Sequence, residues 1–104
     1  MIVHLSEKEF DEKVLKNEKV VLVDFFATWC GPCQMLGPVL EQISQERNDF
    51  EIYKIDIDEE MNLAMNSKIE VVPTMLIYKN GQAVDKKEGF YSKSEIIENI
   101  SKYL

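Results

Sequence analysis

The fold is decided by the stretch Phe25-Phe26-Ala27-Thr28-Trp29-Cys30-Gly31-Pro32-Cys33, which holds both cysteines of the 104-residue chain. An apolar run, Val20–Val23, precedes it, and an amphipathic pattern that includes Leu36 and Leu40 follows it. This change of pattern predicts a buried strand followed by a helix, with Cys30 at the junction and Cys33 in the first helical turn. Unpaired backbone N–H groups and the positive dipole end of a helix favour a thiolate at that place. A thiol that ionises readily attacks disulfides faster at neutral pH.

The spacing of the two cysteines predicts a disulfide that opens and closes with little backbone movement. Residues three apart on a helix have Cβ atoms about 5–6 Å apart, and a local turn brings them to the ~3.5–4.5 Å that a disulfide requires. Pro32 suits the first helical turn, and Gly31 leaves room for the backbone of a partner protein. We therefore interpret the pair as a reversible dithiol. The alternatives are a structural disulfide and a zinc half-site, although structural zinc takes four protein ligands and the chain has two Cys and one His.

The composition predicts one soluble globular domain spanning residues 1–104, with 45% apolar and 30% charged residues. The net charge of −7 argues against nucleic acid as a ligand and favours a soluble monomer. No secretory segment follows Met1, and no apolar run approaches the ~20 residues that span a bilayer. Two cysteines without an export signal fit a reducing, cytoplasmic location. The acidic cluster Asp56–Glu60 lacks the glycine and spacing of a calcium loop and is interpreted as a solvated helix start.

The pattern along the rest of the chain alternates strands with helices. Strands are expected at 2–5, 20–26, 50–57, 75–78 and 82–88, with Asn80-Gly81 as the hairpin turn between the last two. Helices are expected after Ser6, at 32–46, at 60–67 and after Ser92, the last with Ile96, Ile97, Ile100 and Leu104 on one face. This order indicates an α/β fold with a mixed central sheet and helices on both sides.

Further motifs accompany the cysteine pair. Asp24-Phe25-Phe26-Ala27 precedes Trp29–Cys33, and Val72-Pro73-Thr74, Lys79-Asn80-Gly81 and Gly89 follow in register across nearly the whole chain. In these motifs the chain resembles the thioredoxin family. The resemblance implies a central mixed five-stranded sheet flanked by four helices. It also implies a protein-disulfide reductase in which Cys30 is the nucleophile, nearer the surface, and Cys33 resolves the mixed disulfide.

The resemblance also implies partners. These are disulfide-containing client proteins and a thioredoxin reductase that takes its electrons from NADPH. The chain itself has no G-x-G-x-x-G dinucleotide motif, so nucleotide binding falls to the reductase. We expect no metal and no cofactor other than the Cys30–Cys33 pair.

Asp24 is the most informative charge in the sequence, because it interrupts a strongly apolar run. It shares a strand face with Leu22 and Phe26, so its side chain is expected to point inward, where burial raises the pKa of a carboxyl. The resemblance implies that Asp24 lies behind Cys33 and relays a proton when that thiol becomes a nucleophile. It further implies that Lys54, on the neighbouring strand, tunes the pKa of Asp24. A water-facing acid and a plain surface lysine are the alternatives.

Val72-Pro73 is the other half of the predicted site. X-Pro bonds are the main place where cis peptides occur, and the resemblance implies a cis bond here, in a loop beside Cys30. The backbone of Val72 would then pair with an extended segment of a client. An apolar docking rim is expected from Trp29, Val71, Val72, Gly89 and Phe90. For Trp29, ordinary core packing is the alternative.

Four residues depart from the usual family pattern. Phe26 stands where Trp is common, and Gln34 stands where a lysine is common, which removes a positive charge near the thiolates. Val71 and Lys68 replace small residues or glycine near Pro73. These departures bear on the choice of partner more than on the chemistry.

Two rival functions remain open from the sequence. One is an oxidase or isomerase, against which Pro32 argues, because more oxidising relatives have a histidine there that stabilises the thiolate further. The other is a binding subunit that uses the docking surface without turnover.

Overall fold

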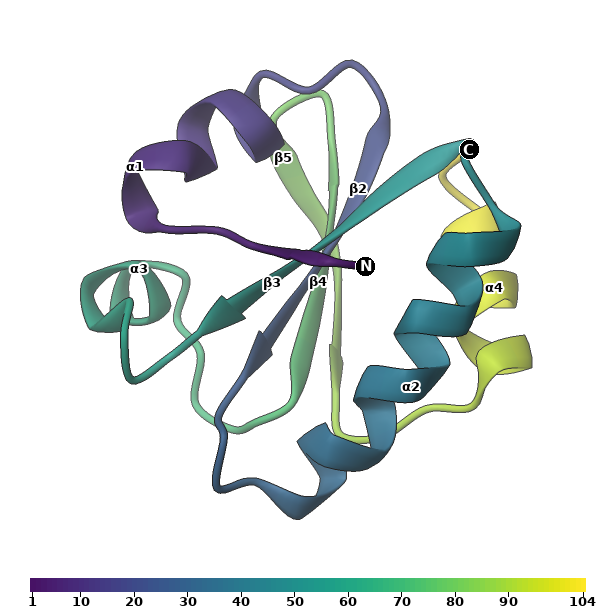
Figure 1. The fold of residues 1–104 in the computed structure, drawn as a ribbon. Helices are drawn as coiled ribbons and strands as arrows, with labels where there is room; N and C mark the ends of the chain where they lie inside the picture. The colour runs from purple at the N-terminus through teal and green to yellow at the C-terminus, as the bar shows by residue number, and fades with distance from the viewer.

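One mixed sheet of five strands organises the computed structural model, which describes residues 1–104 (Figure 1). The strands lie in the order β1 (Val3–His4), β3 (Phe50–Asp56), β2 (Val20–Phe26), β4 (Thr74–Lys79) and β5 (Gln82–Glu88). β1, β3 and β2 run parallel, whereas β4 is antiparallel to β2, and β5 is antiparallel to β4. The expected mixed five-stranded sheet is thus confirmed.

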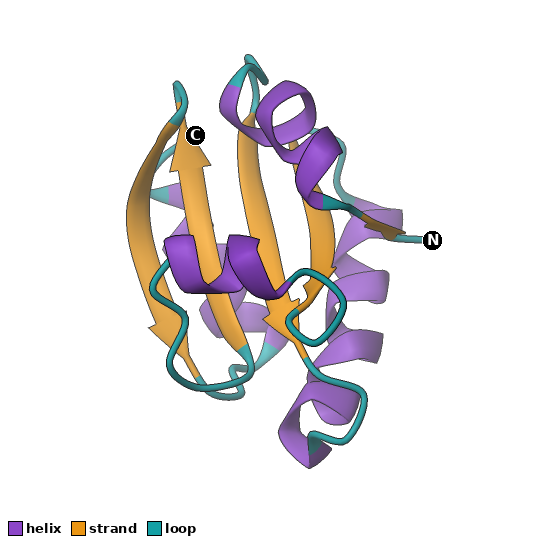
Figure 2. Ribbon diagram, turned by 90° about the vertical axis from the view of Figure 1, so that its left-hand side faces the viewer, coloured by secondary structure: helices purple, strands orange, loops and turns teal.

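The helices cover both faces of this sheet (Figure 2). They are α1 (Glu7–Phe10), which continues as the π-helical segment η1 (Asp11–Leu15), α2 (Gly31–Glu46), α3 (Met61–Asn66) and α4 (Lys93–Ser101). α2 and α4 pack their apolar residues, such as Leu40 and Ile100, against Leu22 of β2. α1, η1 and α3 pack against the opposite face, where Val23 and Phe25 lie. Figure 1 shows the sheet nearly edge-on between these two layers.

β2 is the central strand, as its uninterrupted apolar run predicted. All seven of its residues are buried, and it pairs with β3 on one side and β4 on the other. A strand buried on both faces reads as a continuous apolar run rather than an alternating one. Its side chains alternate between the two cores, with Leu22 in one and Val21 and Val23 in the other.

Several element boundaries differ from the sequence-based expectation. The first strand covers only Val3–His4, and β4 extends one residue beyond the expected segment at each end. Leu104 was expected on the apolar face of the last helix, and this is wrong: α4 ends at Ser101 and Leu104 is exposed. Tyr103, near the end of the chain, lies against β5 instead, where its hydroxyl donates a hydrogen bond to a carboxylate oxygen of Asp85 at 3.0 Å.

One edge of the sheet is formed by a strand rich in charged residues. β5 is the outer strand beside β4, and the register between these two strands shifts at Ile77/Tyr78 in a β-bulge. Ion pairs join neighbouring charges on β5, from Lys86 to Glu88 and from Lys87 to Asp85.

None of the helices has the length and apolar character needed to cross a lipid bilayer.

One end of the sheet collects the segments that carry the predicted site. Phe26 at the end of β2 is in register with Asp56 at the end of β3, and Thr74 at the start of β4 is in register with Glu88 at the end of β5. The segment after β2, the loop before β4 and the residues after β5 therefore emerge at the same end. The fold thus brings the Cys30 and Pro73 segments together from distant parts of the sequence.

Candidate active site

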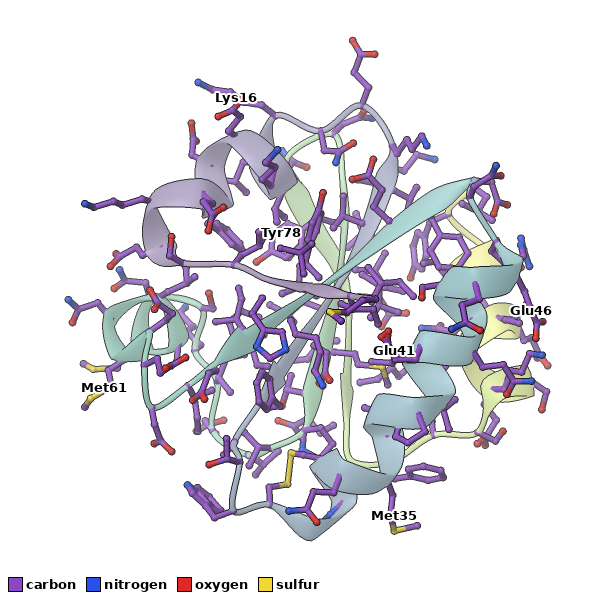
Figure 3. All side chains as sticks on the ribbon, viewed as in Figure 1. Lys16, Met35, Glu41, Glu46, Met61 and Tyr78 are labelled. Atoms are coloured by element: carbon purple, nitrogen blue, oxygen red, sulfur yellow. A yellow bond between two sulfur atoms is a disulfide. The ribbon has the colours of Figure 1, made fainter.

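Cys30 and Cys33 are joined by a disulfide at the N-terminal end of α2, visible as a yellow bond near Met35 in Figure 3. Cys30 is the N-cap residue of the helix, and Cys33 lies in the first turn, as predicted. Their Cα atoms are 5.2 Å apart. The backbone N–H of Cys33 donates a hydrogen bond to Sγ of Cys30 at 3.1 Å. The sulfur of Cys30 thus accepts a donor that the start of a helix leaves free, which favours negative charge on that sulfur.

Cys30 was expected to lie nearer the surface than Cys33, but the two cysteines are almost equally buried. Cys30 is 5% exposed and Cys33 is 4% exposed. Cys30 is covered because the carbonyl oxygen of Val72 lies 3.6 Å from its Sγ. Position in the helix, rather than exposure, distinguishes the two sulfurs in this oxidised form. Beside them, a Cβ built on Gly31 would meet no atom within 4 Å, so the outer side of this turn is open.

Asp24 is completely buried on the face of the sheet that α2 covers. Neither of its carboxylate oxygens has a hydrogen-bond partner. Burial raises the pKa of Asp24 from its ordinary 3.8 to about 7, and the positive charge of Lys54 opposes this rise. The inward orientation is therefore confirmed, and the water-facing alternative is wrong.

Lys54 is the residue of β3 that is in register with Asp24. Its ammonium nitrogen lies 4.5 Å from the centroid of the Phe26 ring, within the range of a cation–π contact. A Cβ built on Gly37 of α2 would lie 3.6 Å from the same nitrogen. The ammonium group therefore lies between the end of β2 and the helix, and the tuning of Asp24 by Lys54 stays a prediction.

The loop before β4 lies against the disulfide. The Val72–Pro73 peptide bond is cis, as the resemblance implied. Pro73 is buried, and its carbonyl oxygen accepts the N–H of Gly89 at 2.8 Å. The side-chain oxygen of Thr74 donates to the carbonyl of Val71 at 2.6 Å. The structure thus brings Pro73, Val72 and Gly89 together beside Cys30.

Three of the predicted rim side chains are exposed at the surface. Trp29 is 68% exposed, Val71 is 46% exposed and Phe90 is 42% exposed. The alternative interpretation, that Trp29 packs in the core, is therefore wrong. Met35, which was not among the predicted site residues, is also exposed and points away from the body of the protein (Figure 3).

Two acidic residues have roles that the sequence did not reveal. The indole N–H of Trp29 donates to a carboxylate oxygen of Asp58 at 2.8 Å, which fixes the orientation of the ring. Asp56 is buried, and one of its oxygens accepts the N–H groups of Asp58 and Glu59. The cluster is thus only partly a solvated helix start, since its first member orders the turn that presents Asp58. No sequence signal links Asp58 to Trp29, because 29 residues separate them.

Two of the departures from the family pattern have clear structural settings. The side-chain amide of Gln34 donates to the carbonyl oxygen of Thr28 at 3.0 Å, so it fastens the segment before Cys30 in place of supplying a cation. Lys68 has φ of +58°, a left-handed conformation that favours glycine. No group of three or more His, Cys, Asp or Glu side chains is arranged to hold a metal ion.

The geometry agrees with comparisons to known proteins. Residues 1–102 match the family model described as Thioredoxin. A thioredoxin of Staphylococcus aureus (strain Mu50) is 41% identical over 104 residues, which cover 99% of this chain and 98% of the relative. A thioredoxin of Mycoplasmoides gallisepticum is 36% identical over 95 residues, which cover 91% of this chain and 95% of the relative. The chain belongs to the thioredoxin family, and it is a thiol–disulfide oxidoreductase whose redox-active pair is Cys30 and Cys33.

Proposed function

We propose that the protein reduces disulfides in client proteins, with Cys30 as the attacking thiolate and Cys33 as the resolving thiol. The observation that carries this assignment is the placement of the Cys30 sulfur at the start of α2, where it accepts the Cys33 N–H at 3.1 Å. The same donor and the helix dipole stabilise a Cys30 thiolate in the reduced protein. Cys33 lies inside the first turn and within disulfide distance of Cys30.

The reaction consists of two exchanges. The Cys30 thiolate attacks one sulfur of the client disulfide, which forms a mixed disulfide and releases the other client sulfur as a thiolate that takes up a proton. The thiol of Cys33 then loses its proton and attacks the Cys30 sulfur. The second client thiolate leaves and is protonated. The client has gained two electrons, and Cys30 and Cys33 have become a disulfide.

Asp24 is assigned the exchange of the Cys33 proton. Its carboxyl is buried on the face that α2 covers, and a pKa raised to about 7 by burial lets it accept and release a proton near neutral pH. Lys54 is assigned the tuning of that pKa through its positive charge. Gly31 and Pro32 shape the turn that holds the sulfurs, and Pro73 shapes the facing loop.

Clients dock on the apolar rim formed by Trp29, Val71, Val72, Gly89 and Phe90. The backbone N–H and C=O groups of Val72 make no backbone–backbone hydrogen bond within the chain, which supports their pairing with an extended client segment. A segment paired there passes directly over the Cys30 sulfur, because the Val72 carbonyl lies 3.6 Å from that atom.

Further parts of the proposal concern the setting of the reaction. The protein acts as a single-domain monomer in the cytoplasm, without a metal or an additional cofactor. A thioredoxin reductase returns the Cys30–Cys33 disulfide to the dithiol with electrons from NADPH.

The direct test is reduction of insulin disulfides in the presence of a thioredoxin reductase and NADPH. We expect turnover by the native protein and none by either Cys30→Ser or Cys33→Ser. The two variants separate the assigned roles, because Cys33→Ser retains the nucleophile and accumulates a mixed disulfide with the client, which mass spectrometry detects, whereas Cys30→Ser does not. A mixed disulfide formed through Cys33 would reverse the assignment.

The rival functions are tested separately. A reduction potential near those of strongly oxidising relatives would favour an oxidase. Retention of the full biological role by a Cys30→Ser, Cys33→Ser double variant would favour a binding subunit without turnover.

A further inference from the structure

A row of polar side chains crosses three strands of the sheet next to the active site. His4 of β1 is in register with Lys54 of β3, and Lys54 is in register with Asp24 of β2. Side chains in register on parallel strands point to the same face. The shared face is the one covered by α2, since Ile52 of β3 and Leu22 of β2, each two residues before a member of the row, lie in that core.

Phe26 connects the members of this row. It lies two residues after Asp24, so it occupies the same face, and it is almost fully buried. Its ring contacts the His4 imidazole edge-on, with centroids 5.2 Å apart and planes inclined by 65°. The Lys54 ammonium lies 4.5 Å from the centroid of the same ring.

The position of Lys54 has no other specific polar support. Its ammonium takes part in none of the ion pairs of the molecule and in no side-chain hydrogen bond. A lysine side chain has a flexible four-carbon stem and loses considerable conformational entropy when it is held in one place. The negative ring face of Phe26 and the closeness of α2 at Gly37 are therefore what hold this charge.

We propose that Phe26 is a positioning residue for proton exchange at the active site, because its ring holds the Lys54 ammonium beside the Asp24 carboxyl. The inference rests on the proposed role of Asp24 in exchanging the Cys33 proton. The proposal explains why residue 26 is aromatic, beyond the need to fill the core. An aliphatic side chain of similar size would pack there but would offer no face to the cation.

The other charged groups around Asp24 do not replace this contact. On β4 its neighbour is Met75, which is uncharged. Asp56, two residues after Lys54, accepts the N–H groups of its own turn. Lys87 of β5 pairs with Asp85, and Glu41 of α2 accepts the N–H of Ile2. His4 contacts the ring of Phe26 and lies one strand further from Asp24.

The experiment is a titration of the Asp24 carboxyl, followed by its carbon NMR signal, in four proteins: native, Phe26→Leu, Lys54→Met and the double variant. Release of the ammonium removes an opposite charge, so we expect Phe26→Leu to raise the pKa of Asp24 above about 7 by roughly half a pH unit or more. Lys54→Met is expected to raise it further. In the Lys54→Met background, Phe26→Leu is expected to change nothing more.

Two further variants separate the cation–π contact from packing. Phe26→Trp offers a stronger π face and is expected to keep or lower the pKa of Asp24. Replacement of the Phe26 ring by pentafluorophenyl preserves the shape but removes the negative ring face, so the pKa is expected to rise without loss of the fold.

Two results would overturn the proposal. One is an unchanged pKa of Asp24 in both Phe26→Leu and the pentafluorophenyl protein. The other is a Phe26→Leu effect that persists in full without Lys54, which would mean that the ring acts by excluding water. Because the readout is a titration and not turnover, it is independent of the insulin assay: failure of turnover in the native protein would count against the proposed function alone.

Discussion

The two faces of β2 differ in what they contribute, although their residues alternate along one strand. Toward α1, η1 and α3, the face presents Val21, Val23 and Phe25, all fully buried in an apolar core. Toward α2, it presents Leu22 and then Asp24, a carboxyl with no hydrogen-bond partner. Burial of apolar surface stabilises the folded state, whereas burial of an unpaired carboxylate destabilises it. Both faces bury apolar side chains, but only the face toward α2 also carries a destabilising group.

The largest effect is expected on the apolar face. Phe25→Ala removes a completely buried ring and leaves a cavity, so the free energy of unfolding should fall by about 3–5 kcal/mol. Urea denaturation measures this change. Phe25→Leu, which leaves a smaller cavity, is the matched control and should lose less. An equal loss from both variants would contradict the argument from cavity size.

The neighbouring substitution should have the opposite sign. Asp24→Asn removes the ionisable carboxyl, and the difference between about 7 and 3.8 corresponds to about 4 kcal/mol when the carboxyl is ionised. Since a buried amide also lacks partners, we expect a net gain in stability of about 2–4 kcal/mol at pH 8. The rate of client reduction should fall, because proton exchange with Cys33 is lost.

The sign of the pH dependence follows from the raised pKa of Asp24. Below pH 3.8 the carboxyl is protonated in both the folded and unfolded states, so the penalty is absent. As the pH rises from 3.8 to about 7, only the unfolded state ionises, and folding loses stability. The advantage of Asp24→Asn should therefore shrink toward zero near pH 4, as urea denaturation at several pH values would measure. An advantage independent of pH would contradict this account.

A smaller effect is expected at the rim of the site. Asp58→Ala removes the acceptor of the Trp29 indole N–H, a contact at the surface whose loss corresponds to about 1 kcal/mol. We expect the KM for insulin reduction to rise by a few fold, with little change in stability. Asp58→Asn, which keeps an acceptor oxygen, is the control, and its KM should lie between those of the native protein and Asp58→Ala. A loss of stability with unchanged KM would assign Asp58 to folding instead of docking.

The smallest effect concerns the loop before the cis peptide bond. Lys68 has φ of +58°, so Lys68→Gly should relieve strain and raise the free energy of unfolding by about 0.5–1 kcal/mol. Asn80 has φ of +54°, but asparagine tolerates this conformation, so Asn80→Gly should give a smaller gain. Urea denaturation of both variants checks the ranking, and a larger gain at Asn80 would contradict it.

Local signals explain why so much of the fold could be predicted. The run at β2, the capping residue Ser92 and the turn Asn80-Gly81 each specify structure within a few residues, and the structure contains the strand, helix and hairpin that they indicated. The ends of elements were less well predicted. β1 is limited to the two residues that pair with β3, and this pairing is a long-range property.

The site residues divide in the same way. Cys30, Cys33 and Asp24 stand out within one stretch, because an acid in an apolar run and two cysteines three apart are local patterns. The contact of Trp29 with Asp58 and that of Phe26 with Lys54 join separate strands and loops. The near-equal burial of the two cysteines depends on the Val72 loop. Such features require the tertiary arrangement, which periodicity does not contain.

The outer strand β5 has a consequence for self-association. An uncovered strand invites another chain to add to the sheet, and charged side chains together with bulges oppose such pairing. β5 carries Asp85, Lys86, Lys87 and Glu88, and a bulge shifts its register with β4. Copies of the protein are thus discouraged from pairing edge to edge into aggregates, even though apolar side chains such as Trp29 and Val71 are exposed elsewhere on the surface.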